Sequence, residues 1–191
     1  MPITKIDLNR FRITPESMER CRKREEELHR KRFGLVEIEL TKKEIAEAEE
    51  IAELRYKSGD VFNGFVGALG ELAVEKFLMA ADEKKFDQLV DREQRPLGDE
   101  GYDMVWNRLR IEVKCTRKHF ADIELRVPHP HDADLFVMTK AYRKNGGWSV
   151  DLIGWITLEE YLREEKPNVF GEDGVSRNKL RKISEWIEQK G

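Results

Sequence analysis

The sequence predicts an α/β fold in which helices flank a central mixed β-sheet, with an N-terminal helical arm added to it. Segments with helical periodicity come first, and a run of short extended segments follows before the chain returns to helix. A run of strands between helices is typical of a sheet that helices cover. The 191 residues suit one domain with an added arm, so we expect the arm at residues 1–60 and the domain at residues 61–191.

The composition limits the functions that the chain can serve. Charged residues make up 38% and the formal net charge is -3, so the chain as a whole is not a polycation. Any nucleic-acid contact must therefore depend on local basic patches. No apolar run approaches the ~18 residues of a membrane span, and Cys21 and Cys115 form no motif. We expect a soluble cytoplasmic protein with reduced thiols.

The arm is expected to contain two helices. The first, residues 14–33, is charged on nearly all sides, so we expect it on the surface or against a partner. Its basic stretch between Arg20 and Arg32 is typical of a solvated helix, and a nucleic-acid or dimer contact is the alternative. The second helix is expected to begin at a capping box of Thr41 and Glu44.

The next helix, residues 64–79, carries the first candidate site residue. One of its faces begins with Gly64 and Gly67 and continues to Glu71. Each glycine costs about 1 kcal/mol of helix stability relative to alanine, which is tolerable if another part of the backbone comes close. We therefore expect Glu71 to be the one polar group on a closely approached face.

The remaining elements are short. Their periodicity predicts strands in one half of the chain and two closing helices. The expected strands lie at residues 85–90, 102–106, 109–116, 123–128, 134–142 and 148–156. The expected helices lie at residues 157–165 and 179–190.

The stretch from Gly101 to Thr116 is expected to form a β-hairpin. If Asn107–Arg108 is its two-residue turn, Met104 lies opposite Ile111. Side chains alternate between the two faces of a strand. Apolar residues of the hairpin then share one face, which we expect to lie against the core.

The opposite face of this hairpin carries Asp103, Glu112 and Lys114. Directly opposed residues have Cβ atoms about 4.5–5.5 Å apart, so the two carboxylates repel each other and one pKa should rise. A hard divalent cation removes this repulsion because it binds several oxygen atoms. A salt-bridged cluster on a solvated sheet face is the alternative, and it requires no function.

The order Asp103, Glu112, Lys114 resembles the core signature of the PD-(D/E)XK nuclease superfamily. The upstream helix that carries Glu71 resembles the acid-bearing first helix of that superfamily. The similarity covers roughly residues 63–187, and the later segments resemble small nucleases of phages and archaea. The resemblance implies a restriction-endonuclease-like core within the α/β class.

The resemblance also implies a metal-dependent reaction. Asp103, Glu112 and the backbone carbonyl of Val113 would bind Mg²⁺ or Mn²⁺, and Glu71 would complete the shell directly or through water. Lys114 would orient or activate the attacking water and offset charge on the phosphate. The implied activity is hydrolysis of DNA phosphodiester bonds, with an endonuclease favoured. A metal and a positioned ammonium suit this chemistry because they stabilise the developing negative charge.

Basic residues next to the hairpin motif are candidates for DNA contact. They are Arg108, Arg110, Arg117, Lys118 and His119, and the only acid among them in the sequence is Glu112. Such a patch suits phosphate contacts, which position DNA without specifying sequence. Ordinary surface charge is the alternative. The expected partner is duplex or branched DNA, with RNA also compatible, and a homodimer would suit paired cuts on two strands.

Two other interpretations stay open. The first is a DNA-binding or structural protein with the same fold and a degenerate, inactive nuclease core. The presence of all four expected side chains argues against it. The second is an interaction protein whose charged N-terminal helices bind a partner while the sheet acts as a scaffold.

Overall fold

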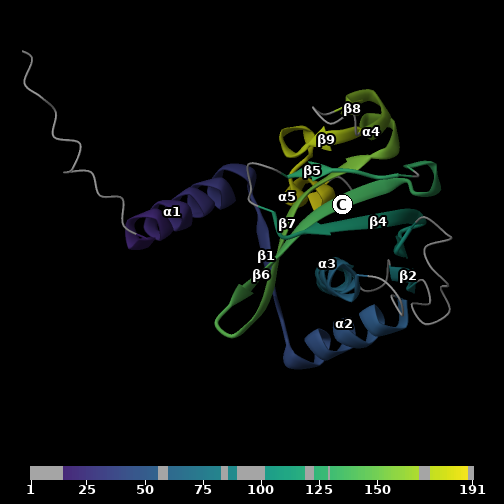
Figure 1. Ribbon diagram of the computed structural model, residues 1–191. Helices are drawn as coiled ribbons and strands as arrows, with labels where there is room; N and C mark the ends of the chain where they lie inside the picture. The colour runs from purple at the N-terminus through teal and green to yellow at the C-terminus, as the bar shows by residue number, and fades with distance from the viewer. Residues whose placement is uncertain are drawn as a thin grey trace, which may run out of the picture.

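The computed structural model describes residues 15–55, 60–82, 86–89, 102–118, 123–128, 130–167 and 173–188. Within these residues, helices flank a six-stranded sheet (Figure 1). The helices are α1 (Pro15–Phe33), α2 (Lys42–Arg55), α3 (Val61–Asp82), α4 (Leu158–Glu164) and α5 (Ile183–Glu188), with short 3-10 helices at Pro130–Asp132 and Arg177–Lys179. The strands are β1 (Val36–Leu40), β2 (Phe86–Leu89), β3 (Met104–Trp106), β4 (Leu109–Thr116), β5 (Glu124–Leu125), β6 (Leu135–Lys144), β7 (Gly147–Thr157), β8 (Lys166–Pro167) and β9 (Asp173–Ser176). No helix among the described residues has both the length and the apolar character needed to cross a membrane.

The strands of the main sheet lie in the order β1-β7-β6-β4-β3-β2. Strands β4 and β6 run parallel, and the other neighbouring pairs are antiparallel, so the sheet is mixed. A smaller sheet has the order β5-β9-β8. Figure 1 shows it together with α4 on the side of the main sheet away from α2 and α3. The predicted α/β class, with a mixed sheet flanked by helices, is confirmed.

Two apolar clusters cover the two faces of the main sheet. The larger cluster joins α2, α3 and α5 to the strands and includes Leu69, Val137 and Trp186. The smaller cluster lies under α4 and the small sheet and includes Phe136 and Tyr161. Phe136 and Val137 are neighbours on β6 but belong to different clusters, as expected of a strand that is buried on both faces.

The helix starts follow local capping chemistry. The capping box of α2 is confirmed, because the Thr41 amide donates to the Glu44 carboxylate at 2.6 Å and the Glu44 amide donates to the Thr41 hydroxyl at 3.2 Å. Helix α3 begins at Val61 rather than at residue 64. The carboxylate of Asp60 accepts a hydrogen bond of 3.1 Å from the Asn63 amide, which satisfies a donor of the first turn.

The last helix is shorter than the sequence predicts. The α-helical part begins only at Ile183, and the residues before it form the 3-10 helix Arg177–Lys179. Arg181 then pairs with Trp155, through backbone hydrogen bonds of 2.8 and 3.1 Å. This pairing satisfies backbone groups of β7 beyond Leu152, which pairs with the first residue of β1, and it is incompatible with a helix start at residue 179.

Gly70 lies where α3 comes close to β4 and β6. A Cβ atom at Gly70 would lie 2.6 Å from the Cβ of Cys115 and 2.7 Å from the Oγ1 of Thr139. A Cβ atom at Gly67 would meet nothing within 4 Å. The expectation that Gly67 marks the closely approached face is therefore wrong, because the rotation of α3 turns Gly70 toward the strands.

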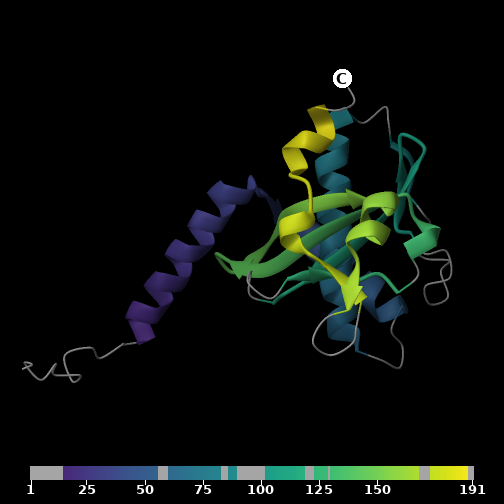
Figure 2. The same ribbon diagram turned by 90° about the horizontal axis from the view of Figure 1, so that it is seen from above.

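The segments before residue 60 differ in how they join the sheet. Strand β1 is an edge strand of the main sheet, and α2 packs in its larger core. Helix α1 instead projects away from the sheet, as the two views of Figures 1 and 2 show. Its last turns reach back to the strands through the side chain of Arg30.

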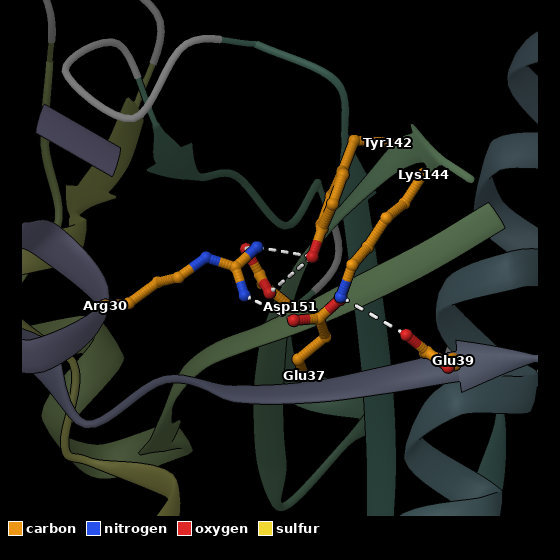
Figure 3. A network of polar contacts seen from close by, with 6 residues as sticks. All are labelled: Arg30, Glu37, Glu39, Tyr142, Lys144 and Asp151. Atoms are coloured by element: carbon orange, nitrogen blue, oxygen red, sulfur yellow. Dashed lines mark hydrogen bonds and ion pairs between the residues drawn. The ribbon is translucent and has the colours of Figure 1, made fainter. Parts of the chain in front are cut away.

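Arg30 joins α1 to a polar network on the sheet (Figure 3). Its guanidinium donates to the carboxylate of Glu37 at 2.7 Å and to that of Asp151 at 2.9 Å, and it also contacts the hydroxyl of Tyr142. Asp151 is only 1% exposed. Burial raises the pKa of Asp151 to about 6, although the charge of Arg30 acts in the opposite direction. Lys144 bonds to Glu37 and thereby links the end of β6 to the same network.

Candidate active site

The β3–β4 hairpin positions the candidate site. Its turn is Asn107–Arg108, with φ angles of 50° and 64°, the left-handed values that a type I′ turn requires. Met104 pairs with Ile111, and both side chains are buried in the larger core next to α3. The predicted turn, register and core face of the hairpin are confirmed.

Asp103 lies just before β3 and takes the place of a strand residue beside β4. Its amide donates to the Ile111 carbonyl at 2.7 Å, and its carboxylate accepts a hydrogen bond of 2.7 Å from the Val113 amide. The N–H and C=O groups of one strand residue point to the same side. The Val113 carbonyl therefore faces the side on which Asp103 lies, as expected of a predicted metal ligand.

Glu112 and Lys114 project from the same face of β4, because they are two residues apart. Their side chains form an ion pair. The Glu112 side chain is 12% exposed and that of Lys114 is 35% exposed. The pair therefore lies at a partly buried position that solvent, or a bound substrate, can still reach from the lysine side.

Glu71 approaches the site from α3. It is buried, at 5% exposure, and both of its carboxylate oxygens accept hydrogen bonds from Arg55 of α2, at 2.7 and 3.1 Å. Arg55 is not among the predicted site residues. Its position in line with the core-facing apolar residues of α2 was a signal for this contact, because a buried cation requires an anionic partner.

The four predicted side chains form one electrostatic group. Burial raises the pKa of Asp103 well above its usual value, and the charges of Glu71 and Glu112 raise it further, against the Val113 hydrogen bond and the charge of Lys114. Burial alone would lower the pKa of Lys114, but its ion pair with Glu112 and the charges of Asp103 and Glu71 raise it overall. The structure thus brings Glu71, Asp103, Glu112 and Lys114 together.

The donor groups suit a hard cation, but the chain's own cations pair with two of them. The described residues contain no group of three or more His, Cys, Asp or Glu side chains arranged to hold a metal ion. Glu71 pairs with Arg55, and Glu112 pairs with Lys114. Asp103, Glu112 and the Val113 carbonyl still offer oxygen atoms on one side of β4, which is the chemistry that Mg²⁺ and Mn²⁺ prefer.

The candidate DNA-contacting residues lie at both ends of β4 rather than in one patch. Arg108 belongs to the turn before β4 and is exposed, whereas Arg117 and Lys118 follow its last residue and are exposed there. Arg110 bonds to Asp134, with its guanidinium nitrogens 3.1 and 2.9 Å from the carboxylate oxygens. The expectation that Glu112 is the only acid nearby is therefore wrong. His119 lies outside the described residues.

Comparison of the chain with models of protein families, with curated proteins and with solved structures finds no match. The likeness to PD-(D/E)XK nucleases therefore stays one of motif order and spacing.

Proposed function

We propose that the chain is a metal-dependent nuclease with a restriction-endonuclease-like core, which hydrolyses phosphodiester bonds of DNA as an endonuclease. The observation that carries this proposal is the arrangement around Asp103: its buried carboxylate accepts from the Val113 amide, Lys114 pairs with Glu112 beside it, and the charges of Glu71 and Glu112 act on it. Arg55 pairs with Glu71 and Lys114 pairs with Glu112, whereas the buried charge of Asp103 is unfavourable unless a further cation compensates it. Groups with strongly shifted pKa values are concentrated at functional sites.

Each residue has a role that follows from its position. Asp103, Glu112 and the Val113 carbonyl would hold Mg²⁺ or Mn²⁺, and such an ion, when bound, lowers the pKa of water and neutralises charge on the phosphate. Lys114 stays protonated at neutral pH because its pKa is raised. It therefore acts as a hydrogen-bond donor to water or to a phosphate oxygen, and not as a proton acceptor. Glu71, held by Arg55, adds negative charge from the α3 side.

Cleavage assays test this proposal directly. Supercoiled plasmid and labelled single-stranded, duplex, flap and four-way-junction DNA are incubated with the protein and Mg²⁺, Mn²⁺ or EDTA. We expect metal-dependent cleavage, with a loss of about 100-fold or more in Asp103→Asn, Glu112→Gln and Lys114→Ala. Glu159→Gln, which removes an exposed carboxylate on α4, is the matched control and should cleave like the wild type. Failure of the folded protein to cut any substrate with either metal contradicts the proposal.

A second candidate function is a nucleic-acid-binding module without cleavage. The observation that favours it is the pairing of Glu71 with Arg55 and of Glu112 with Lys114, which compensates two of the carboxylates without a metal. The two candidates differ in metal binding. A nuclease should be stabilised by Mn²⁺ in a thermal unfolding assay, and Asp103→Asn should lose that shift, whereas an inactive module should show no shift at all.

A further inference from the structure

Two arginines lie against aromatic rings at the far end of β4. The guanidinium carbon of Arg117, the residue after β4, lies 4.8 Å from the ring centre of Phe62 and 5.7 Å from that of Trp148. The guanidinium carbon of Arg143 lies 4.5 Å from the ring centre of Trp148, its partner in the β6–β7 ladder. Both arginines are exposed. We call these four residues the arginine–aromatic surface.

The aromatic rings of this surface pack on a buried aromatic side chain, Phe65. Trp148 is buried and packs edge-on against Phe65 at 5.4 Å, and Phe65 in turn lies 6.3 Å from Phe62. Phe62, on the first turn of α3, is 47% exposed. A large exposed ring fixed on a buried aromatic base is ordered before any ligand arrives, so little conformational entropy is lost on binding.

Arg117 and Arg143 differ in their ion pairing from the arginines near the candidate active site. Arg55 pairs with Glu71, and Arg110 pairs with Asp134. Within the part of the chain that the structure describes, neither Arg117 nor Arg143 forms an ion pair with a carboxylate. Among the described residues, no carboxylate competes with an anionic ligand for the two guanidinium groups. An arginine beside an exposed aromatic ring suits nucleic acid, because it offers both a phosphate contact and a stacking plane.

The surface lies near the candidate active site along both β4 and α3. Along β4, Arg117 is three residues from Lys114, or about 10 Å. Along α3, Phe62 is nine residues from Glu71, or about 13–14 Å. Arg117 is an odd number of residues from Lys114, and Trp148 beside it belongs to the cluster on the α3 face of the sheet. Glu112 and Lys114 project from the other face of β4, so the surface lies next to the candidate active site along the chain but on the other face of the sheet.

We propose that the arginine–aromatic surface binds an unpaired nucleotide of the substrate, with its base stacked on Phe62 and the neighbouring phosphates bound by Arg117 and Arg143. Cleavage of this nucleic acid rests on the proposed nuclease function, but the binding does not. In duplex DNA the faces of the bases are covered by their neighbours, so Phe62 selects nucleic acid that has an unpaired base. Phe62 is then the residue that determines specificity for substrate structure.

Binding in the presence of EDTA tests this inference separately from cleavage. Fluorescence anisotropy with labelled oligothymidine, a blunt duplex and the same duplex carrying a single-stranded flap measures the affinities. We expect the wild type to bind the single strand and the flap about tenfold or more tightly than the blunt duplex. Phe62→Ala should lose this preference, and Phe62→Tyr should keep it. Arg143→Ala should weaken binding of all three and reduce its dependence on salt.

Met79→Ala is the matched control, because Met79 is also a large exposed apolar residue of α3, 42% exposed, near the other end of the helix. It should bind all three oligonucleotides as the wild type does. Unchanged single-strand binding by Phe62→Ala overturns the inference and points to a protein partner for this surface. Phe62-dependent binding without cleavage in Mg²⁺ or Mn²⁺ overturns the proposed nuclease function and supports the inference. A Phe62→Ala protein that cleaves DNA and binds all three oligonucleotides as the wild type does overturns the inference and supports the proposed nuclease function.

Discussion

Asp103 carries a charge that is unfavourable for folding, and the proposed reaction requires that charge. Its carboxylate is buried near Glu71 and Glu112, so the folded protein holds its pKa well above the value in the unfolded chain. The folded state therefore binds more protons than the unfolded state above the unfolded pKa. The contribution of Asp103 to stability falls as pH rises through this interval. Such a residue is retained for function more readily than for stability.

Two substitutions at Asp103 separate its charge from its hydrogen bond. In Asp103→Asn an amide oxygen can still accept from the Val113 amide, and the repulsion from the other acids is gone. We expect this variant to be at least as stable as the wild type at pH 7 in EDTA. In Asp103→Ala the buried Val113 amide loses its acceptor, so this variant should be about 1–3 kcal/mol less stable than Asp103→Asn.

Urea unfolding in EDTA measures both free energies of unfolding, and plasmid nicking with Mg²⁺ measures activity. Both variants should be inactive. An Asp103→Asn protein that is clearly less stable than the wild type contradicts the electrostatic argument. An Asp103→Asn protein with full activity contradicts the proposed function.

The residues of the candidate site differed in how far sequence could predict them. Asp103, Glu112 and Lys114 lie on one hairpin, where a two-residue turn and the period of a strand determine which side chains meet. Their grouping was therefore predictable from local rules. Arg55 meets Glu71 only because α2 packs against α3. No local rule specifies that contact, since it depends on how two helices are oriented in the folded protein.

At the level of whole elements, the packing of α3 on the sheet depends on Gly70. The glycines of this helix predicted a close approach on the face of Gly64 and Gly67, and the structure places the close contact at Gly70 instead. Helical spacing leaves several faces compatible with the same glycines, and only packing on β4 and β6 selects one of them. The structure selects Gly70, next to Cys115 and Thr139, and leaves Gly67 in open space.

Alanine substitutions at these two glycines should have opposite effects. A methyl group at Gly70 would lie 2.6 Å from the Cys115 Cβ, so α3 would have to shift. We expect Gly70→Ala to lose about 1–3 kcal/mol of stability. Gly67→Ala meets no atom and improves helix propensity, so it should gain about 0.5–1 kcal/mol. Urea unfolding of the two variants checks this, and a stable Gly70→Ala protein would contradict the close packing of α3 on the strands.

On the scale of the whole molecule, the polar network of Figure 3 joins three strands and a projecting helix. Glu37 of β1, Tyr142 of β6 and Asp151 of β7 all contact Arg30 of α1. The sequence predicted α1 as a charged helix on the surface, and it projects accordingly. It did not predict the attachment point, because Arg30 and Asp151 are 121 residues apart and only the order of strands in the sheet brings them together.

The burial of Asp151 gives this network a predictable dependence on pH. Its pKa is about 6 in the folded protein, raised from 3.8 mainly by burial. Between these values the folded state keeps a proton that the unfolded state has released. The free energy of unfolding therefore falls as pH rises from about 4 to 6, by about 3 kcal/mol for this one group. Above pH 6 the group is ionised in both states and its contribution is constant.

Asp151→Asn removes this titration and so isolates it. We expect the stability of the wild type, measured relative to Asp151→Asn by urea unfolding, to decrease between pH 4 and pH 6 and then to level off. Ser149→Ala is the control, because Ser149 is buried on the same strand but does not titrate in this range. Its stability relative to the wild type should not change with pH. A difference between wild type and Asp151→Asn that is constant or rises over this interval would show that Arg30 holds Asp151 ionised throughout, and that α1 is attached by a permanent ion pair.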